Sequence, residues 1–431
     1  MNRREFFKLS AITASILVNI NIEAAIKSKK TNSSVLILGG GFAGLYCAKY
    51  LKELNPNLDV TVIEKNPIFI SCPFSNAWLG EIDAFEYKDL CFDYNSTVLK
   101  YNYNFINETI VDINRDKKEV ITENQVVKYD FLIMTLGIDY NYKKLFRRDK
   151  KKAKECELKA PAGLKPGSEL IKLKKMIQNF KGGNFVITLP KSSYKCPPAP
   201  YERACMIANY FKNNKINGKV ILVDPRLKPA SKAKIYLNVF ANEYKDFIEY
   251  KPLTKFKNID FKSKKISVSR YDKNNDKNIK ENIFFEEASI IPPNKANKLY
   301  KKANIDMYTQ GWVKLKQPTY QTISDEDVYV IGDAQGEYPF PKSAQMASSC
   351  AYILAKDIDL RIKNKIFNYK KNLPANVCYS IITNKKGAWV SHDYKFEDKL
   401  IAISKSSNLN TQSYQSAKDW YSGFTKELFE I

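Results

Sequence analysis

The order of apolar and polar positions predicts two βαβ units in this chain. The apolar run 34–38 is typical of a buried parallel strand, and it is followed by an expected helix over 45–54 and an expected strand over 60–64. A second unit begins with the β-rich run 185–190 and has its next strand at 219–224. Two such units predict an α/β protein with two Rossmann-like domains.

A glycine-rich turn joins the first expected strand to its helix. Gly39 permits the tight turn, Gly41 lets the backbone approach a pyrophosphate, and Gly44 allows the helix to pack closely on the strand. The acid that ends the next strand, about twenty residues further on, would accept hydrogen bonds from ribose hydroxyls. The residues expected at the dinucleotide are Gly39, Gly41, Phe42, Ala43, Gly44, Glu64 and Lys65.

The corresponding turn of the second unit has no glycine. It carries Cys196, three prolines and Glu202 in the run 194–203. Without glycine the backbone cannot come close to a pyrophosphate, and proline lacks the N–H donor that a phosphate would need. We therefore expect that the protein does not use NAD(P)H as its electron donor.

Two later strands favour FAD over NAD in the first unit. The run 129–137 ends at Gly137, and the run 328–333 ends at Gly332 and Asp333. A strand that ends in Gly-Asp resembles the segment that brings an aspartate to the flavin in flavoproteins with two dinucleotide-binding domains. Each run alone could be an ordinary buried strand, but their order and spacing together predict an FAD site.

Cys72 lies in the run 68–76, which would pass beside a flavin ring. Three interpretations are open from the residues alone: a covalent attachment point for the flavin, a redox-active thiol, or a cysteine packed in the core. Burial preferences favour the packed cysteine.

The first residues have the pattern of an export signal. Arg3 and Arg4 precede the short apolar run 11–22, which is too short to span a bilayer as a stable helix. We expect a twin-arginine signal over 1–25 and a periplasmic protein, with an uncleaved anchor as the alternative. This route carries folded proteins, often with their cofactor bound.

The chain is strongly basic, with 70 basic and 46 acidic residues and a net charge of +24. The lysines are spread along the whole sequence, so we expect no nucleic-acid partner. An acidic protein partner or an anionic substrate stays open.

Cysteine and histidine usage excludes several kinds of site. The chain has eight cysteines without a C-x-x-C pair and only one histidine, His392. A zinc site, a haem with a histidine ligand and a Ser-His-Asp triad are therefore not expected, and no metal site is predicted.

Together these segments resemble the flavoprotein subunit of flavocytochrome c sulfide dehydrogenase, of the glutathione-reductase-like flavoproteins with two dinucleotide-binding domains. The most specific segments are 196–204, 341–343 and 377–380. The resemblance implies two Rossmann-like domains and a C-terminal α+β domain. The implied parts are an FAD-binding domain over 33–145 and 295–365, a central region over 146–294 without a nucleotide site, and a flavin-binding and interface domain over 366–431.

The resemblance also implies the chemistry. Cys196 and Cys378 match a redox-active disulfide beside the flavin, and Cys72 matches the cysteine that holds FAD covalently. Glu202 is the candidate proton acceptor, and Lys342 adds positive potential near the flavin, where Asn76, Lys342 and Ser343 also join the cofactor site. Pro73 and Ala199 differ from the residues usual in the family, and Pro73 weakens the case for the covalent bond.

The implied activity is oxidation of hydrosulfide to sulfur or polysulfide, with electrons passed through FAD to a separate c-type cytochrome. One alternative is a membrane-surface enzyme that resembles sulfide:quinone reductases and needs an apolar C-terminal helix. A second is a non-catalytic flavoprotein partner of a sulfur-oxidation complex. The expected export signal favours the cytochrome enzyme, and the two widely separated cysteines favour catalysis.

Overall fold

The computed structural model describes residues 33–147 and 149–430. The twin-arginine signal expected over 1–25 lies outside the described residues. Among the described residues, no helix is both long and apolar enough to cross a membrane.

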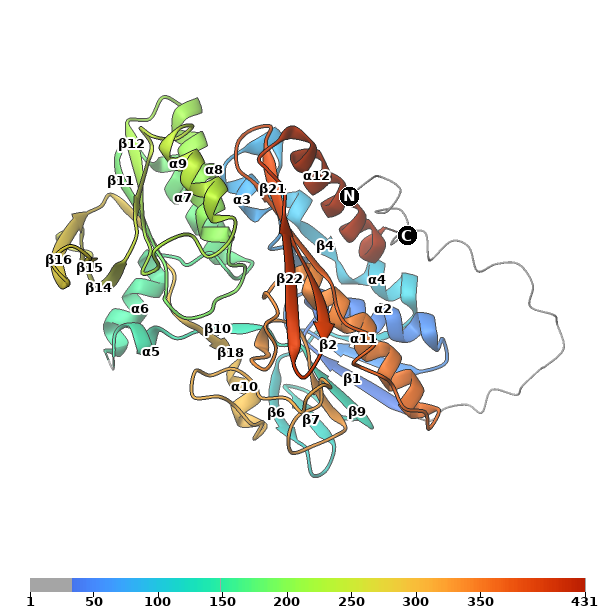
Figure 1. The fold of residues 1–431 in the computed structure, drawn as a ribbon. Coiled ribbons are helices and arrows are strands. Elements are labelled where there is room, and N and C mark those ends of the chain that lie inside the picture. The colour runs from blue at the N-terminus through green and yellow to red at the C-terminus, as the bar shows by residue number, and fades with distance from the viewer. Residues whose placement is uncertain (1–32, 148, 431) are drawn as a thin grey trace. The chain divides into compact units, whose positions relative to one another are not determined.

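The first domain is built on a five-stranded parallel sheet with the strand order β19-β9-β1-β2-β5. Its central strand β1 is almost wholly buried, as the apolar run predicts for a strand covered on both faces. Helix α11 packs along helix α2, as Figure 1 shows. The bounds are β1 (Ser34–Leu38), α2 (Phe42–Leu54), β2 (Asp59–Ile63), β5 (Asn104–Ile106), β9 (Phe131–Met134), β19 (Val328–Val330) and α11 (Ala344–Ile362).

Smaller elements complete this domain and its connection to the next. Strands β3 and β4 pair antiparallel, β6, β7 and β8 form an antiparallel sheet, and β10 pairs with β18. The bounds are β3 (Ile68–Ile70), α3 (Ser75–Leu79), η2 (Ile82–Ala84), η3 (Tyr87–Leu90), β4 (Cys91–Asp93), α4 (Tyr94–Tyr101), β6 (Ile110–Asn114), β7 (Glu119–Thr122), β8 (Val126–Lys128), β10 (Ile138–Tyr140), α5 (Tyr142–Leu145), α6 (Lys150–Lys159), β18 (Asn294–Ala296), α10 (Lys298–Lys302) and η4 (Gly332–Ala334).

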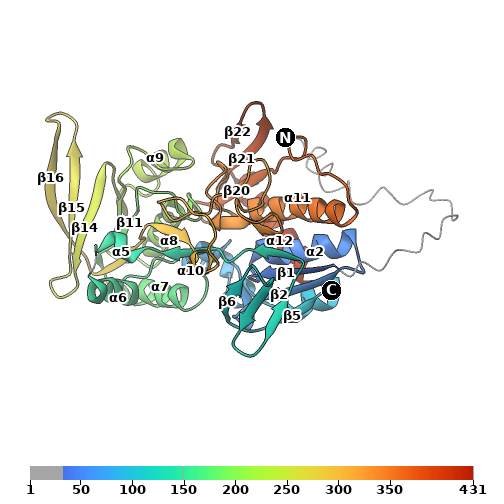
Figure 2. The same ribbon diagram turned by 90° about the horizontal axis from the view of Figure 1, so that it is seen from below.

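The second βαβ unit forms a four-stranded parallel sheet with the order β13-β12-β11-β17. The Lys- and Asp-rich segment between β13 and β17 folds into the antiparallel sheet β14-β15-β16 (Figure 2). The bounds are α7 (Ser168–Asn179), β11 (Gly183–Thr188), α8 (Ala199–Asn213), β12 (Gly218–Val223), α9 (Ala233–Ala241), β13 (Ile248–Lys251), β14 (Thr254–Asp260), β15 (Lys265–Asp272), β16 (Lys277–Phe284) and β17 (Glu287–Ile290).

The C-terminal segment forms an antiparallel sheet, β20-β21-β22, and the helix α12. Helix α12 is tied to α2, because the Tyr46 hydroxyl donates to the Phe424 carbonyl at 2.8 Å and Lys49 pairs with Glu427 at 3.0 Å. Its apolar side is therefore packed against the first domain. The bounds are β20 (Asn376–Ile381), β21 (Gly387–Phe396), β22 (Leu400–Ser406) and α12 (Thr411–Phe429).

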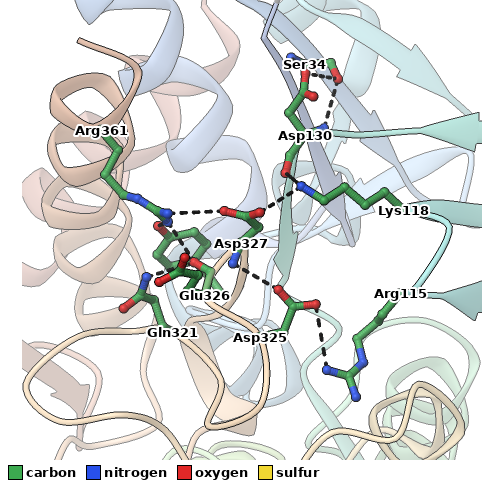
Figure 3. A network of polar contacts seen from close by, with 10 residues as sticks. Ser34, Arg115, Lys118, Asp130, Gln321, Asp325, Glu326, Asp327 and Arg361 are labelled. Atoms are coloured by element: carbon green, nitrogen blue, oxygen red, sulfur yellow. Dashed lines mark hydrogen bonds and ion pairs between the residues drawn. The ribbon is translucent and has the colours of Figure 1, made fainter. Parts of the chain in front are cut away.

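A network of charged side chains fastens the segment before β19 to its neighbours (Figure 3). Asp327 accepts from Lys118 at 2.7 Å and from Arg361 of α11 at 3.2 Å. Asp130 accepts from the backbone N–H of Ser34 at 2.7 Å, at the start of β1. These contacts hold the edge strand β19 in register beside β9.

We expect Asp327→Asn to lower the free energy of unfolding by about 1–2 kcal/mol, because both cations lose their charged partner. Partial exposure of these side chains keeps the loss below that of a fully buried pair. Urea unfolding of the purified protein measures the change. Lys88→Met breaks an exposed pair with Glu86 and should leave the stability unchanged; an equal loss in both variants would contradict a special role for Asp327.

Candidate active site

A cavity of ≈ 240 Å³ collects residues from segments that lie far apart in the sequence. All four predicted catalytic residues line it: Cys196, Glu202, Lys342 and Cys378. The predicted cofactor residues that also line it are Gly41, Phe42, Ala43, Cys72, Asn76, Gly137, Gly332, Asp333, Lys342 and Ser343. Gly39, Gly44, Glu64 and Lys65 lie outside this lining.

Each of the three glycines predicted in the turn meets a different structural requirement. Gly39 has φ +105°, which few residues with a side chain adopt. A Cβ on Gly44 would lie 2.0 Å from the Gly39 carbonyl oxygen, so this glycine lets α2 pack against the turn. A Cβ on Gly41 would meet no atom within 4 Å. Gly41 therefore leaves an open cradle at the N-terminus of α2, where a pyrophosphate can bind.

Glu64 stabilises the turn through its carboxylate. One oxygen accepts from the Gly40 backbone N–H at 2.8 Å, and the other accepts from the Asn66 backbone N–H at 2.8 Å. Carboxylate oxygens have further lone pairs, so a ribose hydroxyl can still donate to Glu64. Lys65 is exposed, and the structure does not bring it to the cavity.

Cys196 occupies a sharp turn just before α8. Its φ is +54°, its N–H donates to the Lys342 carbonyl at 3.0 Å, and its own carbonyl accepts from Ala199 at 2.9 Å. Cys378 lies in the middle of β20, where Asn376 donates from Nδ2 to its sulfur at 3.4 Å. Both cysteines are free thiols in this structure. Burial raises the pKa of the Cys196 thiol, and its neighbours Cys378 and Glu202 raise it further.

Glu202, in the first turn of α8, is held by two donors. The backbone N–H of Ile381 in β20 donates to one carboxylate oxygen at 2.7 Å, and Asn76 donates to the other at 2.8 Å. Burial raises the pKa of Glu202, although these hydrogen bonds lower it in part. Asn76 also accepts from Arg203 at 3.2 Å. The polar atoms of Asn76, predicted to bind the cofactor, therefore orient Glu202 in this structure.

Lys342 is buried, and its ammonium group is held by protein groups. Nζ donates to the carbonyls of Asp333 at 2.8 Å and Gln335 at 2.7 Å, and it lies 3.9 Å from the centre of the Trp312 ring. The next residue, Ser343, caps α11 by accepting from Met346 at 3.2 Å. The N-terminus of α11 therefore faces the cavity, where its partial positive charge favours an anionic group.

We expect Lys342 to make stability depend on pH. Burial lowers the pKa of Lys342 from 10.5 to about 8. Between these two values the unfolded chain binds a proton that the folded chain lacks, so this group makes stability rise with pH across that window. Urea unfolding of the apoprotein should show that Lys342→Met lacks this part of the rise. Lys316→Met, at an exposed position, should follow the wild type; a parallel curve for Lys342→Met would contradict the assignment.

The sequence did not predict two lysines near the cysteines: Lys195, which lines the cavity, and Lys232, which contacts the backbone of Cys378. Lys195 lies with Nζ 3.3 Å from the Cys72 sulfur and 3.8 Å from Asp333. Burial alone would lower the pKa of Lys195, but Cys72, Asp333 and Cys196 together raise it well above its usual value. Its place directly before Cys196 could have pointed to it. Lys232 donates to the Cys378 carbonyl at 3.2 Å, and no sequence signal distinguishes it from the many other lysines.

The acid at the end of β12 is fully buried. One carboxylate oxygen of Asp224 accepts from the hydroxyls of Tyr201 at 2.5 Å and Tyr250 at 3.1 Å. The other accepts from the backbone N–H of Arg226 at 2.9 Å and from its guanidinium at 3.1 Å. Hydrogen bonds from protein groups therefore engage both carboxylate oxygens of Asp224, which in a nucleotide-binding unit would accept from a ribose. Among the described residues, no group of His, Cys, Asp or Glu side chains could hold a metal ion.

The matches to family models follow the three parts of the chain. Residues 33–152 match pyridine nucleotide-disulphide oxidoreductases. Residues 170–283 match the central part of the sulfide dehydrogenase [flavocytochrome c] flavoprotein chain, and residues 371–429 match the flavin-binding part of flavocytochrome c sulphide dehydrogenase. The open cradle at Gly41 and the cavity next to it fit the FAD that a flavin-binding family requires.

Two relatives and one solved structure are informative. The sulfide:quinone oxidoreductase of Mus musculus mitochondria is 24% identical over 347 residues, which are 78% of this chain and 73% of the relative. The sulfide:quinone oxidoreductase of Aquifex aeolicus has the same fold, with a TM-score of 0.68 at 18% identity over 92% of this chain and 91% of that chain. The sulfide dehydrogenase [flavocytochrome c] flavoprotein chain of Chlorobaculum thiosulfatiphilum is 51% identical over 43 residues, which are 10% of this chain and 90% of the relative.

The last relative and the two family models that share its name agree with the resemblance drawn from the sequence. The α/β fold with two Rossmann-like units, expected from the apolar pattern, is likewise confirmed. This chain therefore belongs to the flavoprotein family of flavocytochrome c sulfide dehydrogenase and is an FAD-dependent oxidoreductase.

Proposed function

We propose that this flavoprotein oxidises hydrosulfide to zero-valent sulfur or polysulfide and delivers the electrons to a separate c-type cytochrome. One observation carries the proposal: Cys196 and Cys378 line the same cavity as the glycine cradle of the FAD-binding domain. Two cysteines and a buried carboxylate at one cavity are the groups that thiol–disulfide chemistry with a sulfur nucleophile requires.

The residues that would hold FAD belong to the first domain and to the start of α11. Gly41 offers the cradle for the pyrophosphate, Glu64 can accept from the ribose, and the N-terminus of α11 offers partial positive charge. Bound FAD supplies an acceptor that takes two electrons and releases them one at a time.

The two cysteines carry the sulfur chemistry. In the oxidised protein we place a disulfide between Cys196 and Cys378. Hydrosulfide attacks one sulfur, the S–S bond breaks, and a persulfide and a thiolate are left. A second hydrosulfide attacks the outer sulfur of the persulfide and leaves with it as a polysulfide. The two cysteines then give up an electron pair when their disulfide re-forms.

We propose that Glu202 accepts the proton that the polysulfide product releases. Burial raises the pKa of its carboxyl, which makes the carboxylate a better proton acceptor than an exposed glutamate. Two hydrogen bonds, from Asn76 and Ile381, fix its position between α8 and β20. We propose that Lys342 acts by adding positive potential to the site and not by transferring a proton, because its ammonium already donates to two backbone carbonyls.

We propose Cys72 as the attachment point of a covalently held FAD. It lines the cavity, and the Lys195 ammonium lies 3.3 Å from its sulfur. Acid precipitation of the FAD-loaded protein should leave the yellow colour on the polypeptide, and Cys72→Ser should release it. Release from the wild-type protein would make Cys72 only a neighbour of the flavin.

NAD(P)H is not the electron donor in this proposal. Asp224 is fully used by Tyr201, Tyr250 and Arg226, and Arg226 also donates to the Pro190 carbonyl at 2.9 Å. The match to pyridine nucleotide-disulphide oxidoreductases ends at residue 152, before the second unit begins. NADH should therefore give no reduction of a cytochrome.

We also propose export to the periplasm by the twin-arginine route. The arginine pair and the short apolar run within residues 1–25 support this, and so does the proposed cytochrome partner.

Sulfide-dependent reduction of cytochrome c by the purified, FAD-loaded protein tests the proposed function. A soluble quinone serves as the competing acceptor, because a sulfide:quinone reductase would prefer it. The apolar side of α12 is packed against the first domain, with Phe424 and Leu428 buried, which favours the cytochrome. Faster reduction of the quinone than of the cytochrome would overturn the assignment of the acceptor.

A further inference from the structure

Lys232 is a buried lysine close to the cysteine pair that takes no part in the sulfur chemistry described above. It lies directly before α9, has φ +49°, and is only 9% exposed. Three other lysines are buried among the described residues, and protein acceptors hold each of them. Lys49 and Lys174 pair with glutamates, and Lys342 donates to two carbonyls.

Lys232 differs from Lys49 and Lys174 in having no glutamate partner, and from Lys342 in having one carbonyl acceptor where Lys342 has two. Its Nζ donates to the Cys378 carbonyl at 3.2 Å, and none of the ion pairs found in the described part of the chain includes it. A buried ammonium without a carboxylate in direct contact is costly, so it is expected where an anion arrives during function. The carbonyl that it contacts belongs to one of the two reactive cysteines.

The titratable groups around Lys232 come from α8, the turn before it, β20 and β21. Glu202 comes from α8, Cys196 from the turn before it, Cys378 from β20 and His392 from β21. Burial lowers the pKa of Lys232, while Cys378, Glu202 and Cys196 act to raise it. Burial also lowers the pKa of His392, and Lys232 lowers it further, so His392 adds no positive charge near neutral pH.

We propose that Lys232 is the positioning cation of the cysteine pair: it attracts hydrosulfide to the cavity and compensates the negative charge that remains when the disulfide opens. This inference rests on the proposed function. Hydrosulfide brings one negative charge into a site lined by Glu202 and two sulfurs, and that charge passes to the thiolate when the S–S bond breaks. A cation fixed beside the pair lowers the free energy of this charged state more than water could.

The two lysines that line the cavity, Lys195 and Lys342, are less suited to this role. The Lys195 ammonium is engaged by Cys72 and lies near Asp333, and the Lys342 ammonium is engaged by two carbonyls. Lys232 is also fixed close to the cysteine pair, because its ammonium donates to the backbone carbonyl of Cys378 itself.

Three variants of the FAD-loaded protein separate charge from shape. Lys232→Met removes the charge and keeps the length of the side chain, Lys232→Arg keeps the charge, and Lys234→Met changes an exposed lysine of α9. We expect Lys232→Met to lower kcat/KM for sulfide on the order of 100-fold, as for loss of one fixed electrostatic partner. Both kcat and KM should be affected, Lys232→Arg should recover most of the loss, and Lys234→Met should match the wild type.

A second measurement does not depend on turnover. The protein is reduced, and alkylation of Cys196 and Cys378 by iodoacetamide is followed by mass spectrometry across pH. The pH of half-maximal alkylation of the pair should rise by about one unit in Lys232→Met, because the thiolate loses a nearby positive charge. Lys232→Arg and Lys234→Met should alkylate like the wild type.

Unchanged alkylation together with unchanged sulfide kinetics in Lys232→Met would overturn the role of Lys232. Should Lys232→Met fail to fold, Lys232→Gln takes its place in both measurements. A wild-type protein that does not oxidise sulfide would refute the proposed function, and the alkylation profile would still decide whether Lys232 controls the charge of the cysteine pair.

Discussion

Cys378→Ser is expected to abolish sulfide-dependent reduction of cytochrome c, with a fall in kcat of about 10³-fold or more. Serine can form neither the disulfide with Cys196 nor a persulfide, so the route for sulfur and electrons is lost. FAD should stay bound, because Cys378→Ser is nearly isosteric and leaves the glycine cradle around Gly41 unchanged.

The matched variants make this result specific. Cys196→Ser should lose the same activity, and the double variant should be no worse than either single one, because the two sulfurs act as a unit. Cys91→Ser is the control, since Cys91 is a partly buried thiol that donates to the Tyr87 carbonyl and does not line the cavity. Flavin absorbance reports bound FAD; activity kept by either active-site variant would contradict the disulfide mechanism.

Gly44→Ala is expected to lower the stability of the apoprotein, whereas Gly41→Ala is expected to lower only the affinity for FAD. A Cβ at position 44 would lie 2.0 Å from the Gly39 carbonyl oxygen, so α2 must move away from the turn. We expect the apoprotein to lose about 3 kcal/mol of stability, as for a severe overpacking change. A Cβ at position 41 meets no protein atom within 4 Å, and its φ of −76° suits alanine. Gly41→Ala should therefore fold like the wild type.

The defect of Gly41→Ala should appear when FAD is added. The new methyl group stands in the cradle where the pyrophosphate approaches the backbone, so FAD affinity should fall by about 100-fold, which is about 2.7 kcal/mol. Urea unfolding of the apoprotein and fluorescence titration with FAD measure the two effects separately. Normal FAD binding by Gly41→Ala would place the pyrophosphate elsewhere.

Local patterns in the sequence were sufficient for the main elements of the fold. The apolar run 34–38 and the glycine turn predict β1 and the start of α2, because a buried parallel strand and a tight turn each need particular residues. The run around Cys378, one of the segments that carry the resemblance, forms the strand β20. The expected helix over 45–54 starts three residues earlier, at Phe42, because the Leu45 N–H already bonds to the Gly41 carbonyl.

The roles that the sequence could not predict depend on contacts between distant segments. Asn76 was expected at the cofactor, but its amide bonds to Glu202 and Arg203 of α8. Lys65 was also expected at the cofactor; its side chain is exposed and does not line the cavity. Lys232 has no local pattern around it, and only a tertiary contact with the Cys378 carbonyl of β20 brings it to the cysteine pair. In a chain with lysines throughout, composition cannot show which one is buried.

Because the cavity is lined by residues from both ends of the chain, translation must be nearly finished before the cavity can close around a cofactor. Its wall begins with Gly41 and Cys72, which leave the ribosome early, and it is completed by Lys342, Cys378 and Trp420, which are synthesised much later. A nascent chain can form the cradle but cannot yet enclose a ligand in it. Final loading of the cofactor must therefore wait until translation has passed α12, and a chain that ends before β20 would leave the cavity open beside Cys72.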